Sequence, residues 1–290
     1  DKQGQYHPRF HVRPIEVAHV LDETLFAGVR SATLTSATLS VAGGFDHYQK
    51  RTGVGLRDGS SERYAARKIE SPFDYASQVW LGIPNDLPDP GTPGYSEALA
   101  EVITDSCRAA GGRTFALFTS YRALDEAASR TAHLLGSEYT VLRQGQLPRE
   151  KLLQLFREGR KTILFGTDSF WEGVDVRGEA LSCVIISRLP FRVPSEPIQL
   201  ARAERIEATG GDPFKDMSLP QAILRFRQGF GRLIRHQADR GVVLVLDGRI
   251  KSRRYGQRFL DSLPKGLQPH HDSRSKISAG IRRFFESNRE

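Results

Sequence analysis

The feature that most constrains this chain is an alternation of short apolar segments with amphipathic helical segments, running from Gly94 to Leu246. Apolar residues at offsets of three and four predict helices, and short continuous apolar runs predict buried strands. The predicted helices are residues 96–110, 121–135, 149–158, 196–209 and 220–236, and the predicted strands are residues 113–118, 138–142, 161–165, 180–187 and 242–246. This alternation predicts an α/β fold, with a mostly parallel sheet covered by helices on both faces.

The residues on either side of this alternation differ in pattern. The first part, residues 1–45, contains a strand pattern around 9–17, a helical pattern over 17–26 and an apolar strand that leads to Ser36. Residues 46–93 are predicted as a connector with a short helix near 45–51, a strand over 77–83 and a proline- and glycine-rich loop at its end. The alternating part is assigned to residues 94–265. Residues 266–290 are predicted to carry a docked C-terminal helix.

A Gln-x-x-Gly-Arg-x-x-Arg run lies in the fifth predicted helix. At about 100° per residue, Gln228, Arg232 and Arg235 share one helix face, away from the apolar Phe226 and Phe230. One amide and two permanent cations suit an anionic ligand, because the guanidinium fork matches phosphate oxygens in a bidentate way. A solvated basic helix face is the alternative for this run taken alone.

Other candidate residues follow the predicted strands. Small polar residues and glycines at the ends of parallel strands are typical ligand contacts of α/β folds. They are Ser36 and Thr38 after the first strand, Ser120 after strand 113–118, and Thr167, Glu172, Gly173 and Asp175 after strand 161–165. The sequence therefore predicts a ligand site built from several strand ends.

The candidate residues lie in four segments, which resemble motifs III, IV, V and VI of superfamily 2 helicases in this order. The segments are residues 36–39, 117–121, 166–178 and 228–235. The flanking segments Ser71-Pro72-Phe73, Arg188-Leu189-Pro190-Phe191 and Pro194-Ser195-Glu196-Pro197 narrow the resemblance to the DinG/XPD-type DNA helicases. The likeness covers residues 31–262. It implies a RecA-like second motor domain over residues 94–265, with residues 1–45 as the end of the first motor domain. It also implies an ATP-dependent helicase of 5′-to-3′ polarity in DNA repair or replication.

The same resemblance implies roles for the candidate residues at a nucleotide cleft. Arg232 and Arg235 would be arginine fingers that neutralise charge on the transferring γ-phosphoryl group. Gln228, Glu172, Gly173 and Asp175 would contact the nucleotide. Ser36 and Thr38 would couple the nucleotide state to domain closure.

Single-stranded DNA is the implied second ligand. Ser120 and Thr167 are expected to contact DNA phosphates. Phe191 and Arg192, in an exposed proline-flanked loop, are expected to stack on bases and contact phosphates. Ser36 and Ser120 have an alternative as turn formers or helix caps. Phe170 and Trp171 are more typical of a core than of base stacking.

Two elements of a complete ATPase are missing from the sequence. A phosphate loop needs a Gly-Lys pair, and none occurs. A strand-borne Asp-Glu for magnesium is also absent, because Asp125-Glu126 lies in the first turn of a predicted helix. ATP and Mg²⁺ are therefore expected to be held mainly by a first motor domain, and this chain alone is expected to be inactive. A RecA-like nucleic-acid-binding scaffold without ATPase activity is the rival hypothesis.

The chain has two cysteines, Cys107 and Cys183, both in apolar patterns. They are predicted to be buried thiols of a cytoplasmic protein. An iron–sulfur cluster needs about four cysteines, so neither a cluster nor another metal is expected in this chain.

The charge is unevenly distributed. Residues 219–290 hold 16 Lys/Arg and 6 Asp/Glu, a balance of +10, and subtracting this from the net charge of +8 leaves −2 for residues 1–218. A basic end suits a polyanionic partner such as DNA. No apolar run approaches the roughly 18 residues of a membrane span, so no membrane partner is expected.

Overall fold

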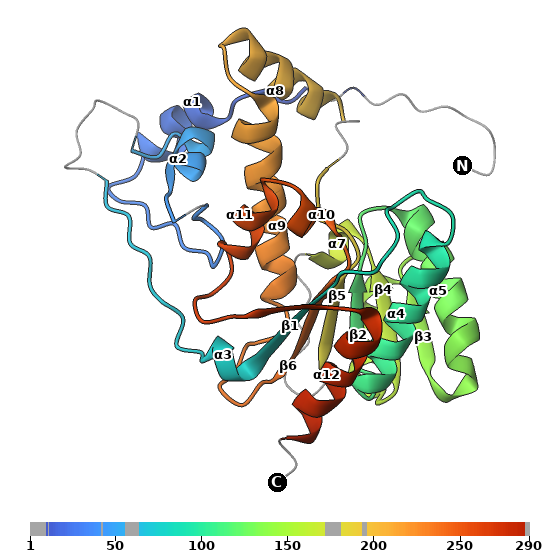
Figure 1. Ribbon diagram of the computed structural model, residues 1–290. Helices are drawn as coiled ribbons and strands as arrows, with labels where there is room; N and C mark the ends of the chain where they lie inside the picture. Colours follow the sequence, from blue (N-terminus) through green and yellow to red (C-terminus); the bar gives the residue numbers. More distant parts are fainter. Residues whose placement is uncertain are drawn as a thin grey trace. The chain divides into compact units, whose positions relative to one another are not determined.

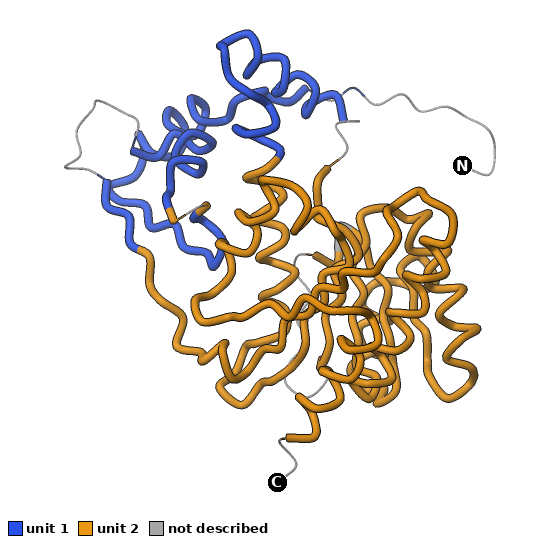
Figure 2. The backbone as a smooth tube through the Cα atoms, in the orientation of Figure 1, with its two compact units in different colours: residues 1–40, 44–67, 193–218 blue, residues 41–43, 68–192, 219–290 orange. Residues whose placement is uncertain are grey.

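The computed structural model describes residues 10, 12–41, 43–55, 64–171, 181–192 and 196–287. The chain forms two compact units (Figure 2). Unit 1 comprises residues 1–40, 44–67 and 193–218, and unit 2 comprises residues 41–43, 68–192 and 219–290. The units are described separately.

Unit 2 is built on a seven-stranded sheet in which every strand pair is parallel (Figure 1). Its strands are β1 (Val79–Pro84), β2 (Thr114–Leu117), β3 (Thr140–Arg143), β4 (Thr162–Gly166), β5 (Cys183–Ile186), β6 (Gly241–Val245) and β7 (Pro269–Asp272). Their order across the sheet is β3-β4-β2-β5-β6-β1-β7. The predicted α/β fold is confirmed. The strand β7 was not predicted, because Pro-His-His-Asp has no apolar run.

Helices cover both faces of this sheet. Their bounds are α3 (Tyr75–Gln78), α4 (Tyr95–Ala109), α5 (Tyr121–Leu135), α6 (Arg149–Glu158), α7 (Asp168–Trp171), α9 (Leu219–Phe230), α10 (Arg249–Ser252), α11 (Gly256–Leu260) and α12 (Arg274–Glu286). One core cluster joins α4, α5 and α12 to one face, and the other joins α6, α7, α9 and α11 to the opposite face. Strands β2, β4, β5 and β6 are buried throughout, as expected for strands covered on both sides.

The order of the strands creates a topological switch point between β2 and β5. These neighbours pair in parallel, with Leu117 opposite Ile186. The chain leaves β2 through α5 on one face, whereas α9, which precedes β6, lies on the other face. Neighbouring strands whose connections leave in opposite directions form a switch point, and ligands of open α/β sheets bind outside the carboxyl ends of such strands.

Unit 1 is helical in its described residues. It contains α1 (Ala18–Leu21), a helical turn η1 (Asp22–Phe26), α2 (Asp46–Thr52), α8 (Pro197–Ala208) and a helical turn η5 (Phe214–Ser218). In α8, the Arg202 Nε atom donates to the Ile15 carbonyl at 3.0 Å, and the Arg205 guanidinium lies 3.4 Å from the Glu16 carboxylate. Segments distant in sequence therefore fold together.

The strands predicted around residues 9–17 and before Ser36 are wrong for the residues that the structure describes. A strand needs a neighbour to accept and donate its ladder hydrogen bonds. The described part of unit 1 forms no sheet that could supply one.

Both cysteines are free and buried in the same core cluster, Cys107 in α4 and Cys183 in β5. Burial raises the pKa of Cys107 to about 11 and also raises that of Cys183. Such thiols are inert packing groups, because the thiolate is the reactive form. In the described part of the chain, no three His, Cys, Asp or Glu side chains are placed to hold a metal ion. The same residues include no helix with the length and hydrophobicity of a membrane span.

Candidate nucleotide and nucleic-acid site

Three of the predicted motif segments meet at Trp171, the last residue of α7. Its side chain is fully buried, and the indole Nε1 donates to the Phe118 carbonyl at 3.0 Å. The Trp171 carbonyl accepts two hydrogen bonds from the Arg232 guanidinium, one from Nε at 3.1 Å and one from Nη2. Trp171 therefore connects the segment after β2, the segment after β4 and the segment after α9.

The Gln-x-x-Gly-Arg-x-x-Arg run packs directly on this tryptophan. A Cβ atom at Gly229 would lie 2.8 Å from a ring carbon of Trp171, so a larger residue would have to displace the indole. The guanidinium carbon of Arg225, a residue only 6% exposed, lies 6.0 Å from the centre of the same ring. Phe170 is buried too, with its ring edge-on to Phe115 at 5.9 Å. Both aromatic residues are core residues, as the sequence favoured.

The predicted helix over residues 220–236 is too long. The helix α9 ends at Phe230, so Arg232 and Arg235 do not share a helix face with Gln228, and that prediction was wrong. Glycine destabilises a helix interior by about 1 kcal/mol relative to alanine, and Gly229 and Gly231 flank this helix end.

The segment after α9 has its own hydrogen bonds. The Asp239 carboxylate accepts from the backbone N–H groups of Arg235 and His236, each at 2.8 Å. A side-chain acceptor of this kind competes with helical hydrogen bonds. Burial lowers the pKa of the half-buried Arg235, and the nearby Asp239 partly offsets this change. A partly desolvated cation of this kind gains from an anionic ligand.

Gln228 lies in the last turn of α9. Its side-chain oxygen Oε1 is buried and has no hydrogen-bond partner among the residues that the structure describes. A buried acceptor without a donor is costly, so this atom is a ready contact for a ligand N–H or O–H group.

The structure describes only some of the other residues that were predicted to contact the nucleotide or to couple its state to domain closure. Glu172, Gly173 and Asp175 lie outside the described residues. Ser36 and Thr38 are exposed residues of unit 1, with their hydroxyl oxygens 3.4 Å apart. The Thr38 N–H also donates to the Ser36 Oγ at 3.2 Å, which is the local turn that the sequence left open as an alternative.

Polar groups at the carboxyl ends of β3 and β4 form a small network. The Thr167 backbone N–H and hydroxyl both donate to the Gln144 Oε1 atom, at 2.6 and 3.0 Å. The Gln144 amide nitrogen in turn donates to the Tyr121 hydroxyl. Gln144 was not a candidate from the sequence, although its place directly after a predicted strand was a usable signal.

Ser120 caps α5, since its Oγ accepts from the Ala123 N–H at 3.4 Å. This is the helix-cap alternative. The hydroxyl can still donate to another group, because a hydroxyl has one donor besides its acceptor sites.

Phe191 differs from its expected exposure. Its ring packs edge-on against Tyr255 and Phe259, with centroids 5.4 and 5.7 Å away, so it belongs to the margin of the core. Arg192 is exposed.

Asp247, a buried carboxylate after β6, holds this loop in place. It accepts from the Leu189 N–H at 2.8 Å and from the Arg249 backbone N–H at 3.0 Å. Its ion pair with the Arg249 guanidinium, at 2.6 Å, raises the pKa of that arginine. The sequence gave no reason to select Asp247, because a single acid after a strand is common.

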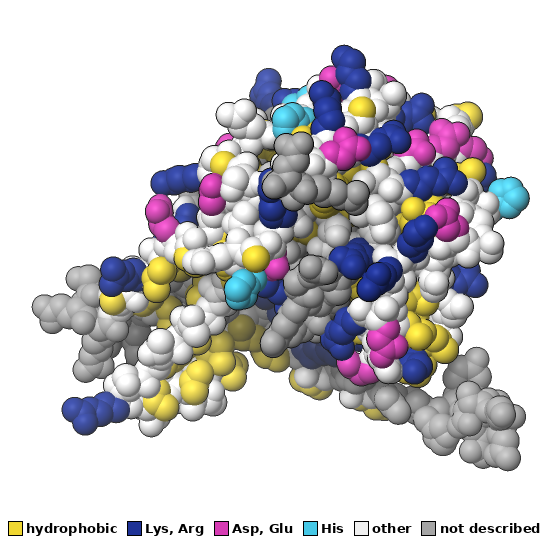
Figure 3. All heavy atoms as spheres, turned by 90° about the horizontal axis from the view of Figure 1, so that it is seen from below, with side chains coloured by type: hydrophobic (Ala, Val, Ile, Leu, Met, Phe, Trp, Pro, Cys, Tyr) yellow, Lys and Arg dark blue, Asp and Glu magenta, His cyan; other side chains and the backbone are white. Residues whose placement is uncertain are grey.

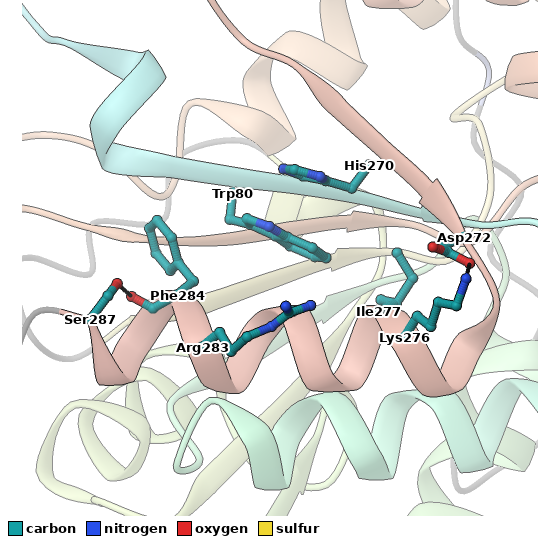
Figure 4. A pocket seen from close by; sticks show the side chains of 9 residues that line it. Trp80, His270, Asp272, Lys276, Ile277, Arg283, Phe284 and Ser287 are labelled. Atoms are coloured by element: carbon teal, nitrogen blue, oxygen red, sulfur yellow. Dashed lines mark hydrogen bonds and ion pairs between the residues drawn. The ribbon is translucent and has the colours of Figure 1, made fainter.

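Unit 2 has two cavities of note. One, of about 290 Å³, opens at the carboxyl edge of the sheet between the first turns of α4 and α5. It includes Ser120, Tyr95 and Arg188 in its lining. The other, of about 460 Å³, lies between α12 and the strands β1 and β7 (Figure 4).

The cavity in Figure 4 lies away from the motif segments. The Trp80 indole is stacked on the His270 imidazole there, with centroids 4.7 Å apart. A Cβ atom at Gly82 or Gly280 would lie 2.5 Å from the indole ring, so both glycines make room for Trp80. The contacts favour a structural role for this cavity, in which the indole fixes α12 to the edge of the sheet.

The excess positive charge does not form a single patch on the face drawn in Figure 3. Lysine and arginine side chains are interspersed there with acidic side chains.

The chain is similar to known helicases. The family described as "Helicase C-terminal domain" matches residues 103–266, more than half of the chain. An ATP-dependent DNA helicase YoaA of Haemophilus influenzae is 41% identical over 257 residues, which are 88% of this chain and 38% of that protein. An ATP-dependent helicase DinG of Mycobacterium tuberculosis is 39% identical over 278 residues, 94% of this chain and 40% of that protein.

Solved structures share the fold. An XPD helicase superposes with a TM-score of 0.53 at 19% identity, over 67% of this chain and 35% of that chain. A Saccharomyces cerevisiae Dbp5 bound to RNA and ADP BeF3 gives 0.51 at 13% identity, over 88% of this chain and 54% of that chain. The chain spans about 40% of the length of the two sequence relatives above. The match to the domain and the RecA-like fold together show that the chain belongs to the DinG/XPD-type helicase family, of which it carries the helicase C-terminal domain.

Proposed function

We propose that this chain is the second motor domain of an ATP-dependent DNA helicase, and that it acts on ATP held by a first motor domain. The observation that carries the proposal is the convergence on Trp171 of the segments after β2, β4 and α9. A motor must connect nucleotide hydrolysis to nucleic-acid movement, and Trp171 joins the candidate nucleotide segment to the candidate DNA segments. The relatives' printed names support both DNA and ATP as ligands.

The nucleotide side of the proposal rests on Gln228, Arg232 and Arg235. The buried Gln228 oxygen lacks a donor among the described residues, so it fits a ligand N–H or O–H group, and Arg235 is a half-buried cation that fits an anionic group. Mg²⁺ and the P-loop of the first motor domain would supply neutralisation of the phosphates. Arg235 would stabilise the charge of the transferring phosphoryl group, and Gln228 would orient it. Arg232 would position the segment by holding the Trp171 carbonyl.

The DNA side rests on the strand ends at the carboxyl edge of the sheet. The Ser120 hydroxyl and the Gln144 amide N–H are donors of the kind that contact backbone phosphates, and Thr167 positions Gln144 through its two hydrogen bonds to the Gln144 oxygen. Arg192 adds an exposed cation near this edge. Contacts to phosphates carry no sequence information, so binding is expected to be indifferent to sequence. The 5′-to-3′ polarity is proposed from the family resemblance.

A scaffold without ATPase activity is the second candidate. It is favoured by one observation, the engagement of the Arg232 guanidinium with the Trp171 carbonyl, which is a structural contact. A pure scaffold does not require a half-buried cation at Arg235 or an acceptor without a donor at Gln228. Hydrolysis in the protein that contains both motor domains separates the two functions.

The 290-residue chain alone is expected to show no DNA-stimulated ATP hydrolysis, because it has neither a Gly-Lys phosphate loop nor a magnesium-binding Asp-Glu. The measurement is phosphate release in the presence of single-stranded DNA and Mg²⁺. Adding a first motor domain from the full-length protein is the positive control. Turnover by the chain alone at roughly 1–100 s⁻¹, abolished by Arg235→Ala, would contradict the assignment of this chain as half of a motor.

Binding of single-stranded DNA by this chain is expected to be weak and to fall steeply with salt. A plot of log affinity against log salt concentration should have a slope of about −0.7 for each phosphate contact. Thr167→Val should weaken binding by about threefold to tenfold, because it keeps the side-chain shape but removes the hydroxyl that holds Gln144 in place. Fluorescence anisotropy with a labelled oligothymidylate measures both effects.

The matched control is Thr140→Val, at the amino end of β3, where the threonine is exposed. Affinity that does not change with salt, or an equal loss in the two variants, would place the DNA path elsewhere.

A further inference from the structure

We infer that the groove between α12 and the outer strand β7 binds an extended, acidic segment of a partner protein, which adds to the sheet beside β7. The groove is the cavity of about 460 Å³ in Figure 4, a volume within the roughly 300–1,000 Å³ of protein ligand sites. Trp80 fixes α12 to the strands, but this structural role does not account for the charged residues around the indole. Such a partner uses neither ATP nor DNA, so its binding is a function beyond the one proposed above.

The edge of the sheet is open to a further strand. β7 is the last strand of the sheet, and its outer edge is unpaired in the part of the chain that the structure describes. The Asn85 N–H donates to the Asp272 carbonyl at 3.0 Å, so the main-chain groups of Asp272 face β1. Main-chain groups alternate in direction along a strand, so the N–H and C=O groups of His271 face the free edge. An unpaired edge is a template for strand addition, which is a common way to bind an extended peptide.

An added strand would place its side chains in the groove. Successive residues of a strand point to opposite faces of a sheet, and His270 and Asp272 of β7 both line the groove. Every second side chain of a strand paired with β7 would therefore lie on the face of the sheet that carries the groove. The opposite wall is α12, whose Lys276, Arg283 and Ser287 side chains lie on the side that faces the strands (Figure 4).

The wall formed by α12 is basic. Lys276 and Arg283 lie about 10 Å apart along the helix, at a rise of about 1.5 Å per residue. Two acidic residues four positions apart on a strand are separated by about 13 Å, a distance that long basic side chains can match. The Arg283 side chain is exposed and forms no ion pair with another described residue. Lys276 lies 3.1 Å from Asp272, the one acidic residue among those that line the groove.

The other face of β7 carries positive charge as well. Burial and the nearby Lys251 lower the pKa of His271, so a further cation lies beside the same edge. Positive charge on both faces of the edge favours an acidic strand. It also disfavours pairing of β7 with the β7 of a second copy, because like charges would then lie opposite each other.

The aromatic residues favour a peptide over single-stranded DNA. The Trp80 indole is already stacked on His270, with centroids 4.7 Å apart, and the Arg240 guanidinium lies 4.9 Å from the centre of the Phe284 ring. Proteins bind single strands by stacking bases on aromatic faces, and one face of each ring is occupied. Trp80, Ile277 and Phe284 instead give the groove an apolar base, which suits an apolar side chain between two acids.

A short fluorescein-labelled peptide tests the groove by anisotropy. On one face of its strand it carries phenylalanine between two glutamates, and on the other face it carries threonines. The 290-residue chain should bind it with a Kd below about 1 mM. Arg283→Ala should weaken binding by about tenfold or more, because a charge-assisted hydrogen bond to a carboxylate is lost. The matched control is Arg282→Ala, an exposed arginine of α12 that does not line the groove and should leave the affinity unchanged.

Two altered peptides test how the segment binds. Lysine in place of both glutamates should abolish binding, because the cations of α12 then meet like charges. N-methylation of the peptide backbone keeps every side chain but removes N–H donors, so methylation opposite His271 should weaken binding by about threefold to tenfold. Unchanged affinity of the methylated peptide would rule out strand addition.

Failure of the wild-type chain to bind the peptide, or equal losses in the two arginine variants, would overturn the inference. Displacement of the peptide by oligothymidylate that also loses affinity in Arg283→Ala would overturn it too, because the groove would then belong to a nucleic-acid path. A dimer of the chain that the peptide dissociates, detected by analytical ultracentrifugation, would show instead that the edge pairs with a second copy.

Discussion

Arg235→Ala is expected to slow ATP hydrolysis by about 10³–10⁵-fold in a full-length helicase that carries this chain, with DNA binding nearly intact. Arginines that neutralise a transferring phosphoryl group contribute rate factors of this size. An exposed ion pair contributes only about 0–1 kcal/mol to the free energy of unfolding. The loss of the Arg235 charge should therefore affect stability much less than it affects the rate of hydrolysis. The backbone hydrogen bond from Arg235 to Asp239 would survive the substitution, because it uses the main-chain N–H group. The turn after α9 should therefore keep its shape.

The structure separates Arg232 from Arg235, although the sequence grouped them. Arg232→Ala removes both hydrogen bonds to the Trp171 carbonyl and should cost about 1–3 kcal/mol of folding stability as well as activity. Arg235→Ala should cost activity with little loss of stability. Arg235→Lys should restore little, since lysine keeps the charge and loses the planar fork.

The measurements are steady-state ATPase rates with saturating single-stranded DNA, DNA affinity by anisotropy, and urea unfolding midpoints. The matched control is Arg160→Ala, an exposed arginine before β4. Near wild-type hydrolysis by Arg235→Ala would rule out the arginine finger. Parallel losses of DNA binding and hydrolysis would instead place Arg235 in the DNA path.

The sequence predicted this sheet well because its strands are continuous apolar runs separated by strongly amphipathic helices. The helices α5 and α6 begin and end at the predicted residues. A strand buried on both faces needs apolar residues at every position, which makes the pattern easy to detect. By contrast, β7 is formed by Pro269–Asp272, and its place in the sheet depends on pairing with β1. Pairing between distant segments is a tertiary effect that a local pattern does not contain.

The candidate site was predicted in its segments but not in its contacts. Motif order identified Gln228, Arg232 and Arg235, yet the helix period placed them on one face because it ignored the competing acceptor at Asp239. Gln144 follows β3 and Thr167 follows β4, so the hydrogen bond between them depends on the pairing of these two strands.

Trp171→Ala is expected to destabilise unit 2 by about 3–5 kcal/mol, the usual range for truncating a fully buried large aromatic residue. Typical domains have only 5–15 kcal/mol in total. The loss includes the indole hydrogen bond to Phe118 and the packing on Gly229.

Trp171→Phe retains part of the ring volume but removes the indole N–H group, which leaves the Phe118 carbonyl without this donor. It should lower the free energy of unfolding by about 1–3 kcal/mol. It should also reduce the stimulation of ATP hydrolysis by DNA in the full-length protein, because the segment after β2 is no longer held to the segment after β4. The chain has two tryptophans, so Trp80→Phe is the matched control. Trp80 is partly exposed and lies on β1, next to the edge strand β7.

Urea unfolding gives the stability of the three variants, and ATPase assays with and without DNA give the stimulation. Trp171→Phe and Trp80→Phe can be compared at matched stability by adding a low urea concentration to the more stable variant. If both then retain the same stimulation by DNA, Trp171 is a packing residue that does not couple the motifs. If stimulation falls in Trp171→Phe alone, a residue that joins the segments after β2, β4 and α9 also transmits the state of one ligand to the other.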